Sequence, residues 1–250
     1  MGILYIIATP LGNLGDITLR ALEILKSVDL VVCEDTRQTV KLLNHFNIAK
    51  PLVSYFQHSK LSKIEYIAGE LAQGKNIALV TDAGTPGISD PGNKLIEELL
   101  KLFPERSIAE PKGFENAKFY PSTSLGNRIS PLKIVPIPGP CAAIAALSIC
   151  GFPTDRFNFM GFPPHKKGRE TYFKKVAAAD ETIVFYESTH RILKAIEQLK
   201  LLMPDRQIVV AREITKMFES IYRGTAEEIL NKLSEDKNNQ KGEFVVVVGK

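Results

Sequence analysis

The chain has 250 residues, of which 44% are hydrophobic and 24% are charged, and its formal net charge is +4 at pH 7. This length can bury a large core in one or two globular domains. No apolar run approaches the roughly 20 residues that cross a bilayer, which argues against a membrane protein. The slight positive charge permits an anionic partner without requiring one.

The three cysteines, Cys33, Cys141 and Cys150, are too few and wrongly spaced for a disulfide framework or a metal site. The chain also lacks His-Glu-x-x-His and Cys-x-x-Cys, so no metal is predicted. The first residues, Met1–Ile7, lack the basic segment of a signal peptide and are typical of a strand. We therefore expect a cytoplasmic protein whose thiols are small apolar fillers.

Apolar runs alternate with amphipathic segments along the first hundred residues. This alternation predicts βαβ units and a largely parallel sheet, which places the protein in the α/β class. The predicted strands are 3–8, 29–33, 52–55 and 77–80, and the predicted helices are 18–27, 38–46, 60–73 and 94–102.

A glycine- and proline-rich loop, Asp82–Gly92, joins a predicted buried strand to a predicted helix. Loops at the carboxyl end of such strands hold ligands in open α/β sheets. Asp90 is placed to cap the following helix. The alternative interpretation is an ordinary tight turn. No Gly-x-Gly-x-x-Gly follows the first strand and no P-loop motif occurs, so the usual dinucleotide and P-loop sites are not expected.

The segment Pro104–Pro131 breaks this rhythm and shows no sustained periodicity. We interpret it as a surface insertion, which is either passive or a lid. A strand resumes at Lys133–Ile137, followed by Pro138-Gly139-Pro140 and a helix of small residues that ends at Cys150. The predicted domains are therefore residues 1–137, with an irregular insertion at about 104–132, and residues 138–250.

The second half is again α/β in pattern, with more hairpin-like pairing. The segment Phe218–Arg223 is typical of an antiparallel strand. Thr225 followed by Glu228 predicts a capping box at a helix start. The other predicted strands are 156–162, 181–187, 207–212 and 242–249, and helices are expected after Arg169, after Arg191 and after Thr225.

Seven motifs follow one another at the ends of predicted strands. In this order they resemble the ribosomal RNA methyltransferases of the tetrapyrrole-methylase superfamily, a group of S-adenosylmethionine enzymes, and the resemblance covers almost the whole chain. The chain departs from the family pattern at Pro104–Leu132. The motifs are Ala8–Asp16, Cys33–Arg37, Asp82–Gly92, Pro138–Pro140, Gly161–Pro164, Phe185–Arg191 and Ala211–Lys216.

The resemblance implies two α/β domains of the tetrapyrrole-methylase type, with S-adenosyl-L-methionine bound in a cleft between them, and a homodimer. It implies methylation of the ribose 2′-hydroxyl of a cytidine in the decoding region of 16S ribosomal RNA, either free or in the assembled 30S subunit, and no DNA partner. The implied cofactor contacts are Pro10, Asp82, Ala83, Gly84, Thr85, Ile88, Cys141, Ala142, Met160, Ala211, Arg212 and Phe244.

Two alternatives to an RNA methyltransferase remain. The same fold supports a small-molecule methyltransferase that acts on a tetrapyrrole or a precorrin, because fold does not fix function. A non-catalytic RNA-binding module is the other alternative. Basic residues at the mouth of the site favour RNA, whereas an enclosed and weakly charged site favours a macrocycle.

Removal of a hydroxyl proton needs a base within hydrogen-bond reach. The candidates at strand ends are Glu34, Asp35, His58, Glu187 and Glu213. We favour Asp35 as a polarising group or base and Arg37 as a clamp for RNA or a carboxylate, with Glu213 next. The alternative is that these acidic residues form structural ion pairs or helix caps.

For RNA, the natural phosphate contacts are Lys166, Lys167, Arg169 and Arg191. The alternative for this basic segment is a solvated loop and helix start. The aromatic residues Phe56, Phe162 and Tyr186 could stack an extruded base or belong to the core.

Overall fold

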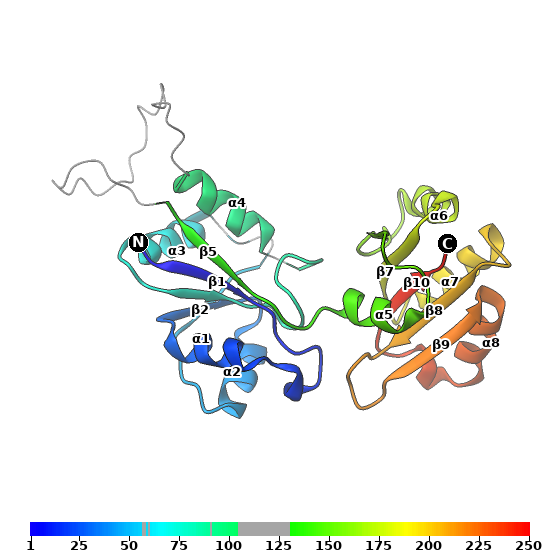
Figure 1. Ribbon diagram of the computed structural model, residues 1–250, viewed down its shortest axis with the longest axis horizontal. Helices are drawn as coiled ribbons and strands as arrows, with labels where there is room; N and C mark the ends of the chain where they lie inside the picture. The colour runs from blue at the N-terminus through cyan, green and yellow to red at the C-terminus, as the bar shows by residue number, and fades with distance from the viewer. Residues whose placement is uncertain (57–58, 60, 91, 105–130) are drawn as a thin grey trace, which may run out of the picture. The chain divides into compact units, whose positions relative to one another are not determined.

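The computed structural model describes residues 1–56, 59, 61–90, 92–104 and 131–250. His58 and almost all of the segment interpreted as an insertion lie outside this range. The chain forms two compact units (Figure 1). The first unit comprises residues 1–8 and 18–138, and the second comprises residues 9–17 and 139–250. The loop that follows the first strand is therefore part of the second unit.

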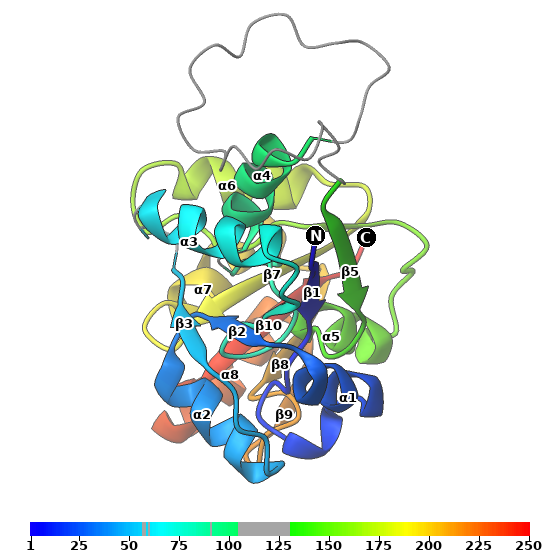
Figure 2. The same ribbon diagram turned by 90° about the vertical axis from the view of Figure 1, so that its left-hand side faces the viewer.

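The first unit contains a parallel sheet of five strands in the order β3-β2-β4-β1-β5. All five carboxyl ends consequently lie at one edge of the sheet, as the alternating pattern predicted. Figure 2 labels four of these strands, β1, β2, β3 and β5, and β4 lies between β2 and β1. The strands are β1 (Ile3–Ile7), β2 (Leu30–Cys33), β3 (Leu52–Ser54), β4 (Ile77–Leu79) and β5 (Lys133–Ile137).

Helices cover both faces of this sheet, with α1 and α2 on one face and α3 and α4 on the other (Figures 1 and 2). Leu4 and Leu79 of the sheet pack with Ile67 and Leu99 of the helices in one buried cluster. Burial on both faces explains why the strands are continuous apolar runs. The helices are α1 (Leu19–Ser27), α2 (Thr36–His45), α3 (Leu61–Ala72) and α4 (Asn93–Leu102).

The start of α4 differs from the prediction that Asp90 caps it. The N-cap residue is Gly92, which makes no side-chain cap hydrogen bond. Gly92 has a φ of 155°, a conformation that a residue with a side chain rarely adopts. The sequence pattern placed the helix correctly but chose the wrong cap, because the strained turn places the glycine at the cap position.

The second unit contains a mixed sheet of five strands in the order β6-β7-β10-β8-β9. Only β6 and β7 are parallel, and the other neighbours are antiparallel. The predicted antiparallel strand near residue 220 is confirmed as β9. The strands are β6 (Phe157–Phe159), β7 (Thr182–Ser188), β8 (Gln207–Arg212), β9 (Ser220–Thr225) and β10 (Glu243–Val248).

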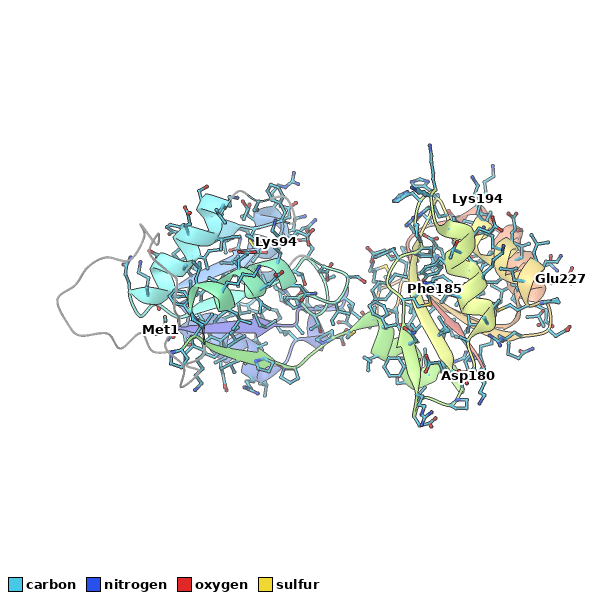
Figure 3. All side chains as sticks on the ribbon, turned by 90° about the horizontal axis from the view of Figure 1, so that it is seen from above. Met1, Lys94, Asp180, Phe185, Lys194 and Glu227 are labelled. Carbon is cyan, nitrogen blue, oxygen red and sulfur yellow. The ribbon has the colours of Figure 1, made fainter. Side chains whose placement is uncertain are left out.

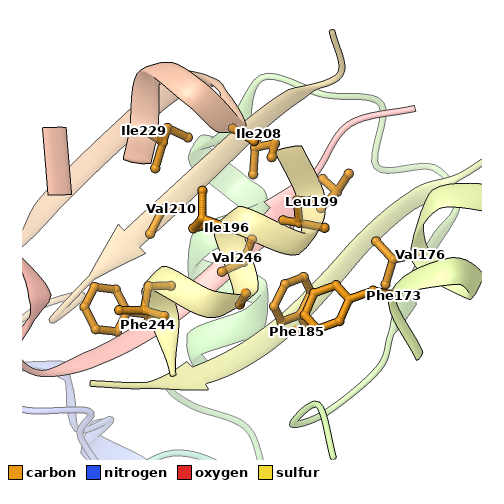
Figure 4. Packing of buried hydrophobic residues seen from close by; sticks show 14 of the residues in the cluster. Phe173, Val176, Phe185, Ile196, Leu199, Ile208, Val210, Ile229, Phe244 and Val246 are labelled. Atoms are coloured by element: carbon orange, nitrogen blue, oxygen red, sulfur yellow. The ribbon is translucent and has the colours of Figure 1, made fainter. Parts of the chain in front are cut away.

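Two clusters of buried side chains lie on opposite faces of this second sheet. Phe173, Phe185 and Val246 belong to the cluster beneath α6, α7 and α8 (Figure 4). Val245 and Val247 belong to the cluster beneath α5. Alternate residues of β10 therefore face opposite sides, as pleating requires. The helices are α5 (Ala142–Cys150), α6 (Arg169–Ala178), α7 (Ile192–Leu202) and α8 (Ala226–Glu235), with short 3₁₀ turns at η1 (Leu14–Asp16) and η2 (Lys237–Gln240).

Helix α8 begins with the capping box that the sequence predicted. Thr225 accepts a hydrogen bond from the Glu228 N–H, and the Glu228 carboxylate accepts one from the Thr225 N–H. Figure 3 shows Phe185 inside the second unit, whereas Lys194 and Glu227 lie at its surface. Over the residues that the structure describes, none of the helices is both long enough and apolar enough to span a bilayer.

Candidate functional site

The topology of the first sheet favours a ligand position at the carboxyl end of β4. Strands β4 and β1 are neighbours, but the helices that follow them, α4 and α1, lie on opposite faces of the sheet (Figures 1 and 2). Loops that leave adjacent strands in opposite directions open a ligand site at the strand ends. The loop that begins at Asp82 follows β4 and therefore lies at this edge of the sheet.

A long-range hydrogen bond joins the loops that follow β2 and β4. The Asp35 N–H donates to Asp82 Oδ1 at 3.1 Å, across 47 residues of sequence. The Asp35 side chain also caps α2, because its Oδ1 accepts from the Arg37 N–H at 2.8 Å. The Asp82 carboxylate thus joins the loops that follow β2 and β4, and the Asp35 cap of α2 fixes the first of these loops.

Asp35 and Arg37 form a bidentate ion pair at the surface. Arg37 Nε and Nη2 donate to the two Asp35 oxygens at 2.6–3.1 Å. Hydrogen bonds from the Arg37 side chain and N–H lower the pKa of Asp35 to about 2. Asp35 is therefore ionised at neutral pH and is a weak base. The Arg37 side chain is 86% exposed, so its guanidinium can reach an anionic partner.

The two neighbouring carboxylates have pKa values shifted in the opposite direction. Burial, followed by the charges of Asp82 and Asp35, raises the pKa of Glu34. Burial and the nearby Asp35 charge also raise the pKa of Asp82, against the bond from the Asp35 N–H. A raised pKa makes a carboxylate a better proton acceptor. Sequence reasoning considered Glu34 but preferred Asp35, because the burial of Glu34 and its approach to Asp82 are tertiary features.

The Asp82–Ile88 loop has a backbone suited to close contact with a ligand. Gly84 and Gly87 have φ values of 83° and 85°, which favour glycine. The Asn93 side-chain amide donates to the Gly87 carbonyl at 2.9 Å and thereby fixes the turn. Small side chains and a fixed turn let backbone atoms approach a ligand closely, which fits the adenosine and amino-acid parts of S-adenosylmethionine.

In the second unit, the predicted cofactor residues Cys141, Ala142 and Ala211 share the face beneath α5. Leu11 packs against the same cluster and brings the loop that contains Pro10 to this face. Gly12 lies against the Lys216 side chain, where a Cβ atom would overlap it. The motif after β1 and the motif at the end of β8 therefore meet on this face, together with the segment that follows Pro138–Pro140.

The motif after β8 is held in a strained conformation by hydrogen bonds. Glu213 and Thr215 have φ values of 50° and 67°, which are unusual for residues with side chains. Buried Arg212 donates to the carbonyls of Lys241 and Phe218 at 2.6 and 2.9 Å. These contacts anchor the motif to the segment that leads into β10.

The Glu213 carboxylate is committed to neighbouring groups. Its Oε1 accepts from the Glu243 N–H at 2.8 Å and from Lys216 Nζ at 3.0 Å. Burial acts to raise its pKa, but these two bonds and the Lys216 charge outweigh burial and lower it. A carboxylate with this lowered pKa is a weak base, so Glu213 orients Lys216 in the structure.

Two predicted cofactor residues lie apart from the rest. The Phe244 side chain is 1% exposed and packs with Val246 on the face beneath α7 (Figure 4). Met160 packs against the same cluster. Their side chains therefore lie on the opposite side of the sheet from Ala211, and only their backbone groups remain for a ligand on the α5 face. The sequence of β10 is a continuous apolar run, so it does not show which residues face α5.

The four predicted RNA contacts divide into two pairs. Lys166 and Lys167 are exposed in the loop before α6. The Arg169 and Arg191 side chains are only 12% and 16% exposed, and both form ion pairs with the buried Glu187 carboxylate, at 3.1 and 2.9 Å. A contact between these arginines and RNA stays a prediction, since their guanidinium groups are engaged within the protein.

One further contact was missed by sequence reasoning. The Tyr186 hydroxyl accepts a hydrogen bond from the Ala143 N–H at 3.1 Å, which links β7 to the first turn of α5. Tyr186 also makes edge-to-face contacts with Phe159 and Phe162. Among the described residues, no group of three or more His, Cys, Asp or Glu side chains is arranged to hold a metal ion.

Comparisons with known proteins agree with the motifs. The family model described as Tetrapyrrole (Corrin/Porphyrin) Methylases matches residues 3–108 and 122–230. A protein named Ribosomal RNA small subunit methyltransferase I from Escherichia coli O157:H7 is 43% identical over 249 residues, which are 99% of this chain and 77% of that protein. The protein of that name from Synechocystis sp. (strain ATCC 27184 / PCC 6803 / Kazusa) is 42% identical over 250 residues, with 99% and 79% covered.

Solved structures share the fold at low sequence identity. The methyltransferase CobJ is matched with a TM-score of 0.65 at 19% identity, covering 100% of this chain and 95% of that chain. The cobalt precorrin-4 methyltransferase CbiF is matched with a TM-score of 0.65 at 17% identity, covering 98% and 94%. These likenesses confirm the predicted fold class. The predicted cofactor position between two domains stays a prediction.

Proposed function

Because the chain belongs to the tetrapyrrole (corrin/porphyrin) methylase family, we propose that it transfers a methyl group from S-adenosyl-L-methionine to small-subunit ribosomal RNA. The observation that carries this proposal is the identity of 42–43%, over 99% of the chain, to proteins named for that activity. The acceptor in the proposal is the 2′-hydroxyl of a cytidine ribose in the decoding region of 16S RNA.

The first-unit loop after β4 supplies part of the proposed cofactor site. When bound, S-adenosylmethionine supplies a methyl group on a positively charged sulfur, so the leaving group is already activated. The protein then has to hold both partners in line, and orientation alone can lower a barrier by roughly 7–11 kcal/mol. Backbone groups from Asp82 to Ile88, on the turn fixed by Asn93, support this holding role.

The second-unit residues Pro10, Cys141, Ala142, Ala211 and Arg212 complete the proposed set. Short side chains at Cys141, Ala142 and Ala211 let backbone groups approach a ligand. Arg212 acts by holding the strained turn at Glu213, because its guanidinium bonds two carbonyls. In the proposal Met160 and Phe244 contribute through the backbone alone.

We assign the proposed catalytic set according to the contacts of each group. Asp35 acts as a polarising charge and Arg37 as a clamp for the substrate phosphate, since their ion pair is exposed. Glu213 acts as a positioning group for Lys216. Glu34, whose pKa is raised by burial and by the Asp82 and Asp35 charges, acts as the proton acceptor in the proposal.

The proposed partners follow from the same activity. Lys166 and Lys167, both exposed, bind phosphates of the RNA. The substrate is the free RNA or the assembled 30S subunit, the enzyme acts in the cytoplasm, and it functions as a homodimer. A tetrapyrrole or precorrin substrate is the alternative, because the solved structures with this fold include enzymes named for precorrin chemistry.

One assay separates these functions. Tritiated S-adenosylmethionine is incubated with 30S subunits from cells that lack the gene, and the labelled nucleotide is mapped. We expect label in the ribose of a single cytidine. Absence of label in any RNA, despite cofactor binding measured by calorimetry, contradicts the proposal and favours a small-molecule acceptor. Absence of cofactor binding favours a non-catalytic RNA-binding module.

A further inference from the structure

A buried carboxylate holds the most basic loop of the second unit in place. Glu187, near the end of β7, has a side chain that is 0% exposed. Its Oε2 accepts from Arg169 Nη1 and Nη2 at 3.2 and 3.1 Å. Its Oε1 accepts from the Ser188 N–H at 2.8 Å and pairs with Arg191 Nε at 2.9 Å. Every oxygen of this buried charge is satisfied.

Both arginines that pair with Glu187 also donate hydrogen bonds to the loop Gly161–Gly168, which we call the basic loop. Arg191 Nη1 donates to the Pro163 carbonyl at 3.0 Å, and Arg169 Nη1 donates to the Pro164 carbonyl at 3.3 Å. The three charged side chains, which we call the clamp, therefore fix two consecutive carbonyls. The segments that carry the clamp are α6, β7 and the start of α7 (Figure 1).

The basic loop presents groups that suit a single-stranded nucleic acid. The Phe162 ring is 49% exposed and stands edge-to-face on Tyr186, with ring centroids 5.4 Å apart. Lys166 and Lys167 are exposed, and within the described residues neither has a carboxylate at ion-pair distance. An aromatic face next to unpaired cations is the combination that stacks a base and binds its phosphates.

Holding a loop with buried charges is energetically unfavourable if its only role is to stabilise the fold. Burying charges costs desolvation energy, and well-packed apolar residues often serve as well. The clamp, with two arginines and one glutamate, also leaves one net positive charge behind the loop. That charge favours phosphate at the loop surface. The clamp therefore contributes a fixed geometry of the basic loop and a net positive charge behind it, rather than stability.

We propose that Glu187 is a positioning residue for RNA binding, which acts through Arg169 and Arg191 to preform the basic loop so that Phe162 stacks a nucleotide base while Lys166 and Lys167 bind adjacent phosphates. This inference rests on the proposed function for the identity of the RNA. A preformed loop binds more tightly because less conformational entropy is lost on binding. Arg169 and Arg191 act behind the loop, and the lysines touch the RNA.

The test uses Glu187→Gln in the full chain, with binding of a fluorescein-labelled single-stranded RNA oligonucleotide measured by anisotropy and KM measured with 30S subunits. We expect the RNA Kd and the KM to rise about tenfold, while kcat and the calorimetric cofactor Kd stay within about twofold. Electrostatics alone predicts the opposite sign, because removal of a negative charge attracts phosphate more strongly. Unchanged or tighter RNA binding by the folded variant overturns the proposal.

A surface variant keeps the test decisive if Glu187→Gln does not fold. Phe162→Ala removes the exposed ring without touching the clamp, and we expect the RNA Kd to rise about tenfold. An unchanged Kd for Phe162→Ala overturns the stacking role. Glu170→Gln is the matched control, because Glu170 lies on α6 in an exposed pair with Lys174. We expect its RNA Kd to stay within about twofold of the wild type.

The outcomes separate this inference from the proposed function. If the wild type binds RNA and Glu187→Gln weakens that binding, the clamp is supported even where no RNA is methylated. If the wild type methylates RNA and Glu187→Gln lowers kcat, cofactor affinity and RNA affinity together, the residue is merely structural and the inference fails. If the wild-type chain binds neither the oligonucleotide nor 30S subunits, the inference fails together with the RNA partner.

Discussion

Each unit contains a cluster in which a carboxylate pairs with arginine at the end of a strand, but the two clusters differ in burial. In the first unit, Asp35 and Arg37 pair at the surface, where the arginine side chain is 86% exposed. In the second unit, Glu187 is 0% exposed and pairs with two arginines that are 12% and 16% exposed. The chemical groups are the same, and only the surroundings differ.

The difference teaches that burial decides what such a pair does. An exposed pair exchanges readily with water and adds little stability, so it is free to meet a substrate. A buried pair cannot lose one partner without leaving an uncompensated charge in the core. The first cluster is therefore suited to chemistry at a sheet edge, and the second is suited to holding a loop. The predictions that follow test this contrast from the largest expected effect to the smallest.

Removal of the buried carboxylate is expected to have the largest effect. Glu187→Ala leaves two partly buried arginines without their anion, and we expect a loss of about 3–5 kcal/mol in the free energy of unfolding. Urea unfolding followed by circular dichroism measures this loss. Glu170→Ala, at an exposed pair, is the control and is expected to cost less than about 1 kcal/mol. Equal losses in the two variants would remove the contrast between buried and exposed pairs.

The exposed pair is expected to matter for activity more than for stability. Asn caps a helix about as well as Asp, so Asp35→Asn keeps the α2 cap but removes the charge. We expect kcat/KM for RNA methylation to fall about 10- to 100-fold, which corresponds to about 1.5–3 kcal/mol for a charged hydrogen bond. The melting temperature of Asp35→Asn shows whether the α2 cap is kept. Full activity in Asp35→Asn would show that Asp35 only caps the helix.

The capping box of α8 is expected to contribute stability without function. Thr225→Ala removes the hydroxyl that accepts from the Glu228 N–H, and we expect a cost of about 1 kcal/mol. Urea unfolding measures the cost, and the methylation assay is expected to give the wild-type rate. A loss of RNA affinity in this variant would mean that second-unit stability, rather than the clamp, controls RNA binding.

The smallest expected effect is a pH dependence of opposite sign at two neighbouring carboxylates. The lowered pKa of Asp35 stabilises the folded chain above about pH 4, and this contribution is lost as the pH falls toward about 2. The raised pKa of Asp82 has the reverse sign. Its charge costs stability near neutral pH, and the cost disappears below its ordinary pKa of 3.8.

Asp82→Asn separates these two contributions. The amide oxygen can still accept from the Asp35 N–H, so we expect the variant to be slightly more stable than the wild type at pH 7, by a fraction of a kcal/mol because solvent screens the charge. At pH 3 we expect equal stability. Urea midpoints at the two pH values measure the difference. A variant that is less stable at pH 7 would show that the Asp82 charge favours the fold.

Much of the fold could be predicted because its signals are local. Apolar runs alternating with amphipathic segments located the parallel strands of the first unit. Thr225 and Glu228, three residues apart, identified the α8 cap. Asp90 shows the limit of such signals. It is a common capping residue close to the start of α4, but the N-cap is Gly92, which lies in a strained turn. The sequence pointed to Asp90 as the cap, whereas the backbone of the turn puts Gly92 at the N-cap position.

The loops at the strand ends could be predicted from the sequence, but the contacts between them could not. The motifs fall at strand ends, so a ligand edge followed from the sequence. Which carboxylate has a raised pKa depends on burial and on the approach of the Asp35 and Asp82 charges, which lie 47 positions apart in the sequence. Which face of β10 carries Phe244 depends on the position of α5. Neither fact has a local signature.

The sequence by itself determined the order of the elements, the glycine- and proline-rich loops and the family, because these depend on patterns within a few residues or on motifs in a fixed order. The tertiary structure alone decided that the loop after β1 belongs to the second unit and that Arg169 and Arg191 turn inward to Glu187. A basic residue has the same sequence signature whether it meets solvent or a buried carboxylate. Only the packing around Glu187 distinguishes the two, because it removes water from one side of the charge.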